Sequence, residues 1–235
     1  MDNNSNHQIK VIGHIETDFT SKFGIPRQSG ISWELEGRII FEEEYRNADA
    51  FRGIEEYSYV WLLWQFSENV RDTWSPTVRP PKLGGNKRMG VFATRSPYRP
   101  NPIGLSCVKL TSVQFTEEYG PILYVRGADL MNGTPIYDIK PYLPYTDSHP
   151  GASGGFTDEL TVRLLEVFIP QDLKERIPEE KLKPLEIVLS QDPRPAYHED
   201  PERVYGFEFA GMEIKFKVHG ELLKVVDVEK KQGYI

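Results

Sequence analysis

The chain has 235 residues, of which 39% are hydrophobic and 12% aromatic, and its formal net charge is −7. This composition is sufficient for a real core, in one large domain or in a main domain with a smaller second one. No stretch approaches the roughly 20 consecutive apolar residues that cross a bilayer, so we expect no membrane-spanning helix.

The first 150 residues are predicted to be almost entirely β-structure. Apolar alternation and β-branched or aromatic runs predict strands at 9–15, 37–41, 57–66, 89–94, 105–115, 121–128 and 136–140. One short helix is expected at 47–53, because Asn47 can cap its start and Gly53 can end it. Many short strands with turns and almost no helix indicate a closed or nearly closed β-barrel.

A flexible segment at 149–155, HPGASGG, is typical of a linker and divides the chain into domains at 1–150 and 151–235. The second part is predicted to be a small α+β domain. We expect a strand at 157–168, helices at 171–176 and 179–189, and antiparallel strands at 205–209, 214–218 and 222–228.

Several classes of site are not expected. The single cysteine, Cys107, cannot form an internal disulfide, fits a reducing cytoplasm and is expected in the core rather than as a nucleophile. Five scattered histidines offer no metal-ligand spacing, so no metal is predicted. Residues 1–7 lack the basic and apolar regions of a secretion signal. No Gly-x-Gly-x-x-Gly motif follows a strand, so a Rossmann nucleotide site is not predicted.

The most informative segment is the loop at 95–102, RSPYRPNP. Its prolines remove backbone donors and push the preceding residues toward extended backbone, which excludes a helix or a paired strand. The loop is therefore stiff, and Arg95, Tyr98, Arg99 and Asn101 carry groups that bind anions, stack on rings and form hydrogen bonds. We interpret it as a preformed binding surface, with a purely structural turn as the alternative.

A basic tract surrounds this loop. Residues 73–116 contain no Asp or Glu and carry +7, so the rest of the chain sums to −14. The basic residues are Arg79, Lys82, Lys87, Arg88, Arg95, Arg99 and Lys109. This concentration favours contact with a polyanion, the alternative being a solvated basic face. Trp74 and Tyr98 are candidates for stacking on bases, whereas Phe92 is expected to face a core.

Four motifs in register resemble the TrmO family, also called TsaA-like or YaeB-like. They are RPPKLGGNKRMG, GVFATRSPYRPNPIGLS, DLMNGTPIYDIKPYLPYTDS and QDPRPAY. The resemblance implies a single-sheet β-barrel with a small C-terminal domain. It also implies an S-adenosylmethionine-dependent tRNA methyltransferase that modifies N6 of threonylcarbamoyl-adenosine at position 37 of threonine tRNA. The family works as a homodimer with the cofactor near the subunit interface.

The resemblance also assigns cofactor-binding residues. Arg95 suits the cofactor carboxylate, and Asp129 suits a ribose hydroxyl or the sulfonium charge. Relatives usually carry His where Ser67 stands, so only main-chain contacts are expected to persist there. The full set is Pro26, Arg27, Gln28, Ser67, Glu68, Arg95, Leu105, Asp129, Leu130, Met131 and Asn132.

The catalytic hypothesis follows from the substrate nitrogen, which belongs to a urea-like group and is a poor nucleophile. The rate acceleration is expected mainly from alignment of N6, the methyl group and the sulfur, and from a favourable local electric field. Asp138 or Tyr137 is a candidate general base. The alternative for Asp138 is an ion pair with Lys140 or an arginine.

Substrate contacts are predicted in two groups. Arg99, Lys140 or Arg194 is expected at the threonyl carboxylate, and Arg79, Lys82, Lys87, Arg88 and Arg99 at phosphates. The stiff loops at 95–102 and 191–197 add Tyr98, Asn101, Asp192 and Tyr197. Two other functions remain open: a non-catalytic RNA-binding module, and a small-molecule methyltransferase on the same barrel.

Overall fold

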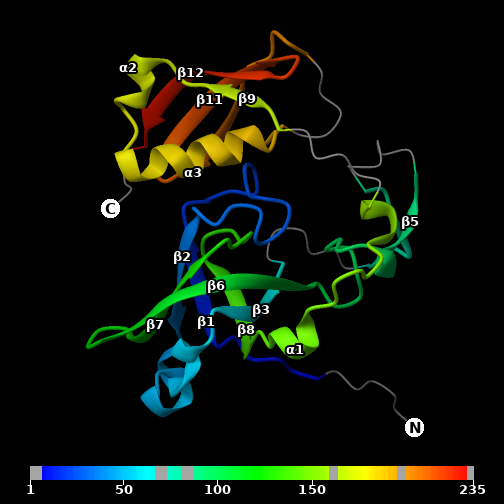
Figure 1. The fold of residues 1–235 in the computed structure, drawn as a ribbon, viewed down its shortest axis with the longest axis vertical. Coiled ribbons are helices and arrows are strands. Elements are labelled where there is room, and N and C mark those ends of the chain that lie inside the picture. Colours follow the sequence, from blue (N-terminus) through cyan, green and yellow to red (C-terminus); the bar gives the residue numbers. More distant parts are fainter. Residues whose placement is uncertain (1–6, 67–72, 81–86, 159–163, 195–199, 232–235) are drawn as a thin grey trace.

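The computed structural model describes residues 7–66, 73–80, 87–158, 164–194 and 200–231. Its larger part is a closed antiparallel barrel with the strand order β1-β2-β7-β6-β3-β8 (Figure 1). The strands are β1 Gly13–Thr17, β2 Glu36–Phe41, β3 Tyr59–Gln65, β6 Ile103–Thr116, β7 Gly120–Arg126 and β8 Thr134–Pro141. The predicted β-barrel is confirmed.

Alternation of buried and exposed residues explains why these segments form strands. In β3, Val60, Leu62 and Trp64 are buried, whereas the residues between them are partly exposed. Side chains of period two place one face of each strand in the barrel interior, where Ile15 and Ile136 also lie. The strand predicted at 57–66 is therefore buried on one face only.

The helix predicted at 47–53 is instead a 3₁₀ turn at Ala48–Phe51, between similar turns at Glu43–Tyr45 and Ile54–Glu56. The Asn47 side chain does cap it, since it accepts a hydrogen bond from the Asp49 backbone N–H. Phe51 packs edge-on against Phe41 with ring centroids 4.7 Å apart, which fixes the turn on the barrel.

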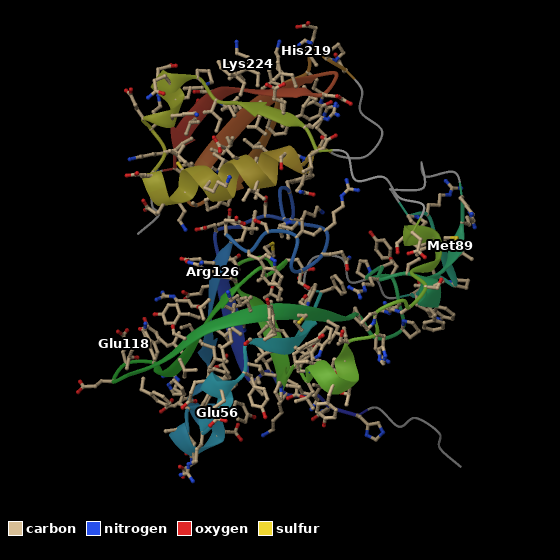
Figure 2. All side chains as sticks on the ribbon, viewed as in Figure 1. Glu56, Met89, Glu118, Arg126, His219 and Lys224 are labelled. Carbon is tan, nitrogen blue, oxygen red and sulfur yellow. The ribbon has the colours of Figure 1, made fainter. Side chains whose placement is uncertain are left out.

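A separate arm projects beside the barrel and holds the two-stranded sheet of β4 (Thr77–Val78) and β5 (Met89–Gly90) (Figure 1). In the view of Figure 2, Met89 in this arm lies across the barrel from Glu118 in the β6–β7 turn. The strand predicted at 89–94 is wrong beyond Gly90, because Val91–Ala93 forms a 3₁₀ turn. The loop at 95–102 has no helix or strand, as predicted.

The C-terminal unit, described at 164–194 and 200–231, contains a four-stranded sheet of order β10-β11-β12-β9. Its elements are β9 Glu166–Phe168, α2 Gln171–Lys174, α3 Glu179–Ser190, β10 Tyr205–Phe209, β11 Met212–His219 and β12 Leu222–Lys230. Strands β10 to β12 are antiparallel as predicted, whereas β9 pairs with β12 in parallel. Of the strand predicted at 157–168, the described part forms only Glu166–Phe168, and Gly155–Thr157 is a 3₁₀ turn.

The helix α3 lies along the sheet on the side that faces the barrel (Figure 1). A short helix, α1 (Pro144–Asp147), follows the last barrel strand. The division at residue 150 stays a prediction. Phe19 and Leu35, which come from the chain between β1 and β2, are buried in the core of the C-terminal unit.

Candidate functional site

Three segments that are distant in sequence meet at one end of β6. The Gly30 backbone N–H donates to the Gly127 carbonyl over 2.9 Å, and the Cys107 backbone N–H donates to Ser29 Oγ over 3.1 Å. Arg95 Nη1 donates to Gln28 Oε1 over 2.5 Å. The loop after β1, the start of the stiff loop and the turn after β7 are thereby held together.

Asp129 is at the centre of this junction. The Ser106 hydroxyl donates to Asp129 Oδ1 over 2.5 Å, and Trp64 Nε1–H donates to Ser106 Oγ over 2.9 Å. Burial raises the pKa of the Asp129 carboxyl, although Ser106, the Ser29 backbone and the charge of Arg95 act in the opposite direction. The barrel therefore supplies a chain of donors that holds one carboxylate against the loop after β1.

The remaining residues of the predicted cofactor set differ in exposure. Arg95 and Arg27 are exposed, Gln28 is half-buried and Pro26 is buried. Leu105 points outward from β6 and is 51% exposed. Arg95 and Leu105 therefore offer a guanidinium and an apolar surface to a ligand.

Leu130 and Asn132 have structural roles in the turn after β7. The Leu130 side chain is buried in the barrel core, and its carbonyl accepts from Thr17 Oγ1 over 3.1 Å. Asn132 Oδ1 accepts from the Thr17 backbone N–H over 3.1 Å, and the Asn132 N–H donates to the Phe19 carbonyl over 2.7 Å. Met131 also accepts, through its carbonyl, from the Thr134 hydroxyl. The roles predicted for these residues at the cofactor stay predictions.

The candidate bases lie on β8. Asp138 Oδ2 forms an ion pair with Lys140 Nζ at 2.8 Å, which is the structural alternative considered for it. The Tyr137 hydroxyl donates to Gln65 Oε1 over 2.7 Å, and burial raises its pKa, so its proton is held more firmly. The catalytic role of either residue stays a prediction.

Strand register relates Asp138 to the cofactor residues. In β3, Leu63 pairs with Leu105 of β6 on one side and with Asp138 of β8 on the other. Directly paired residues point to the same face of a sheet, and two strand spacings amount to about 10 Å. Leu105 and Asp138 therefore share the outer face of the barrel at a separation that a bound nucleoside can bridge.

The stiff loop is held by hydrogen bonds of its own residues and by one from the arm. Arg99 Nη1 donates to the Thr94 carbonyl over 3.3 Å, and the Ile103 N–H donates to the Asn101 carbonyl over 2.8 Å. The Ser75 N–H donates to the Tyr98 carbonyl over 3.3 Å. These bonds keep the loop in one shape, as its prolines predict.

The arm carries an exposed aromatic pair. Trp74 and Phe92 stack with ring centroids 6.2 Å apart and planes at 26°, and they are 50% and 73% exposed. The expectation that Phe92 faces a core is wrong, because Val91 takes the buried position in this turn. Arg79, Lys87 and Arg88 are exposed on the same arm.

The second proline-stiffened loop begins with an internal ion pair. Arg194 Nε and Nη2 donate to the two carboxylate oxygens of Asp192 over 2.7 and 2.8 Å, and Asp192 has a left-handed backbone with φ of 54°. Its predicted substrate contacts stay predictions. Four residues named in the sequence analysis lie outside the described residues: Ser67, Glu68, Lys82 and Tyr197.

Within the described ranges, no cluster of three or more His, Cys, Asp or Glu is suited to a metal ion, and no helix is long and apolar enough to cross a membrane. Cys107 is half-buried rather than in the core, and burial raises the pKa of its thiol, which makes it a weak nucleophile. A cleft of about 280 Å³ between α3 and the end of the barrel at which β2 begins and β7 ends contains no predicted site residue. Its lining is Glu34, Glu36, Arg126, Glu180, Lys181, Lys183 and Pro184.

Comparisons with known proteins cover nearly the whole chain. Residues 14–148 match the family model of the tRNA-methyltransferase O N-terminal domain, and residues 160–231 match that of the TrmO C-terminal domain. The tRNA (adenine(37)-N6)-methyltransferase of Escherichia coli (strain K12) is 39% identical over an alignment of 235 positions, which covers 97% of this chain and 100% of the relative. That of Eikenella corrodens is 40% identical over 75% of this chain and 99% of its own.

A third relative, a putative S-adenosylmethionine-dependent methyltransferase of Pseudomonas aeruginosa, is 35% identical and covers 94% of this chain and 97% of its own. Among solved structures, a crystal structure of TrmO from P. aeruginosa superposes with a TM-score of 0.79 at 30% identity, over 98% of this chain and all of that one. A further TrmO crystal structure has a TM-score of 0.77 at 31% identity, over 95% of this chain and 99% of its own.

Proposed function

This chain belongs to the TrmO family, and we propose that it is an S-adenosylmethionine-dependent methyltransferase acting on N6 of adenosine 37 in tRNA. We further propose threonine tRNA bearing threonylcarbamoyl-adenosine as its substrate, and a cytoplasmic homodimer as its working form. The observation that carries the proposal is the junction at which Gln28 meets Arg95 and Ser106 holds Asp129.

The residues at this junction fit the chemistry of the donor. S-adenosylmethionine supplies an electrophilic methyl group on a sulfonium, together with a carboxylate, an amine and a nucleoside. The exposed guanidinium of Arg95 suits the carboxylate, and Gln28 fixes its orientation. Asp129 supplies negative charge for the sulfonium or an acceptor for a ribose hydroxyl, and Leu105 supplies an apolar contact.

The protein's task in the reaction is mainly to align a poor nucleophile. The stiff loop and the junction around Asp129 are both held by hydrogen bonds before any ligand arrives, so little ordering remains to be done on binding. We assign proton removal from N6 to Asp138 rather than Tyr137. Asp138 is an acceptor on the same outer face as Leu105, whereas the Tyr137 hydroxyl donates to Gln65.

We propose that the arm contacts the tRNA. Exposed stacked aromatics such as Trp74 and Phe92 offer a surface for a base, and Arg79, Lys87 and Arg88 beside them suit phosphates. For the threonyl carboxylate, Arg99 is the preferred cation. Its guanidinium donates to the neutral Thr94 carbonyl, whereas Lys140 and Arg194 pair with the carboxylates of Asp138 and Asp192.

The test is methyl transfer from labelled S-adenosylmethionine to threonine tRNA with and without the threonylcarbamoyl group. We expect label in the modified tRNA only, at adenosine 37. Binding of tRNA without transfer would instead identify a non-catalytic RNA-binding module. Transfer to small acceptors that bulk tRNA does not inhibit would identify a small-molecule methyltransferase.

A further inference from the structure

The chain between β1 and β2, residues 18–35, passes through the C-terminal unit on its way to the cofactor junction. Phe19 is 1% exposed and Leu35 is 3% exposed, and both belong to the core formed by α3 and the sheet of that unit. Phe19 meets Phe209 of β10 edge-on, with centroids 5.5 Å apart. Burial of these two large apolar side chains stabilises the attachment.

Polar contacts fix the same end of the segment. The Asp18 carbonyl accepts from the Ala210 N–H over 2.9 Å, and its carboxylate pairs with Lys181 of α3 at 2.6 Å. The Thr20 hydroxyl donates to Glu208 over 2.6 Å. The Asp18–Lys181 pair is largely shielded, with side-chain exposures of 18% and 26%, so breaking it costs more than breaking a surface pair.

The middle of the segment touches the unit as well. Gly24 has a φ of +83°, and a Cβ added to it would lie 2.4 Å from the Phe207 ring. Only glycine permits both this backbone and this approach. Gly24 stands two residues before Pro26, so the attachment continues almost to the segment that meets Arg95.

The far side of the segment is held by the barrel. The Gly127 N–H donates to the Leu35 carbonyl over 2.9 Å, and the Gly127 carbonyl accepts from Gly30. The segment is thus bonded both to the C-terminal unit and to the turn that carries Asp129. Residues 26–30 connect these two attachments.

We propose that the C-terminal unit is a positioning element of the cofactor site, which holds residues 18–35 so that Gln28 and Ser29 stand ready at Arg95 and Asp129. This inference rests on the proposed function of that site. A loop ordered in advance does not lose its conformational entropy when the ligand binds, so loosening the attachment weakens cofactor binding. The rate of methyl transfer at saturating cofactor is affected less, because the loop makes the same contacts with the cofactor once the cofactor is bound.

Charge reversal of the Asp18–Lys181 pair tests this in the full chain. Asp18→Lys and Lys181→Asp are each expected to raise the Kd for S-adenosylmethionine, measured by calorimetry, about tenfold, which corresponds to about 1.4 kcal/mol. The KM for tRNA and the kcat at saturating cofactor stay within about twofold by the same reasoning. The double reversal restores the pair and brings the Kd back toward that of the parent.

The Lys217–Glu202 pair, at 3.0 Å, is a control on the same unit. Lys217 alternates with the buried Phe216 and Val218, so it lies on the face of the sheet that is turned away from the core. His219 and Lys224 mark the side of the unit away from the barrel (Figure 2). Lys217→Glu and Glu202→Lys are expected to leave the cofactor Kd unchanged.

A milder variant guards against loss of folding. Thr20→Val removes the bond to Glu208, and we expect faster hydrogen exchange of the amides at 24–30 with a cofactor Kd raised about two- to threefold. Parent-like cofactor binding in the Asp18, Lys181 and Thr20 variants would overturn the inference while leaving the proposed function intact. A parent protein that bound no cofactor would remove the proposed function, and the inference with it.

Discussion

Replacement of Ser106 by alanine tests the hydrogen-bond chain beneath the junction. The Ser106 side chain is 1% exposed, and its hydroxyl both accepts from Trp64 and donates to Asp129. Alanine leaves a buried indole N–H without its acceptor and a carboxylate without one of its donors. An unsatisfied buried neutral group costs about 1–3 kcal/mol and a hydrogen bond to a charged group contributes about 1.5–3 kcal/mol, so we expect a loss of about 3–5 kcal/mol.

Urea unfolding followed by tryptophan fluorescence measures this loss. With an m-value of about 3 kcal/mol/M, the unfolding midpoint is expected to fall by about 1–1.7 M. Ser112→Ala is the matched control, because Ser112 lies on the same strand but is exposed. A change at an exposed site of this kind is expected to stay within about 0.5 kcal/mol.

A double-mutant cycle separates the hydrogen bond from simple loss of packing. Trp64→Phe removes the indole donor, so Ser106→Ala in that background no longer leaves it unpaired. The two losses are therefore expected to be non-additive by about 1–2 kcal/mol. Strict additivity, or a Ser106→Ala midpoint equal to that of Ser112→Ala, would refute the reasoning that the chain is a connected unit.

Three further predictions concern the site directly. Burial raises the pKa of the Asp129 carboxyl, so the folded state holds this proton more tightly than the unfolded state. The parent should therefore lose stability relative to Asp129→Asn as the pH rises from below 3.8 through the raised pKa. Urea midpoints of the two proteins that change with pH in the same way would contradict this. Trp74→Ala or Phe92→Ala should weaken tRNA binding by about 1–3 kcal/mol per lost stack with an unchanged salt slope, whereas Arg88→Ala should reduce the log–log slope by about 0.9 in filter binding. Asp138→Asn should lower the single-turnover rate about 10²- to 10⁴-fold, and a parental rate would dismiss Asp138 as the base.

The sequence predicts the fold correctly where the alternation of buried and exposed residues within a strand is enough to identify it. The alternation in β6 and β7 depends on which residues face the barrel interior, and the strands predicted at 105–115 and 121–128 match Ile103–Thr116 and Gly120–Arg126 closely. The error at 89–94 has a different cause. The run from Val91 to Ala93 has strand-like composition, but the described part of the arm (73–80 and 87–94) offers it no further strand to pair with, and Phe92 is 73% exposed.

The sequence predicts the candidate site only in part. Its motifs identify residues expected to face a ligand, but not the residues that hold those side chains in place by hydrogen bonds. Arg95, Gln28 and Asp129 were predicted and do adjoin, whereas Ser106 and Trp64 were missed. A signal for Ser106 exists in the alternation of β6. Gly104, Ser106 and Val108 share the inward parity, and a hydroxyl on a buried face requires a partner.

The two carboxylates of the site differ in environment in a way that suits different tasks. Asp129 is fixed by Ser106 in surroundings that disfavour its charge, so a cationic ligand beside it relieves an unfavourable state already present in the free protein. Asp138 pairs with Lys140 at a partly exposed position on the outer face, from which a proton can pass to solvent. Each carboxylate suits the other role less well, because Asp129 is held by the Ser106 hydroxyl and Asp138 already has Lys140 as its counter-ion. This asymmetry supports the proposed donor binding at Asp129 and deprotonation at Asp138, and the register places Leu105 and Asp138 on either side of Leu63 on the outer face of the barrel.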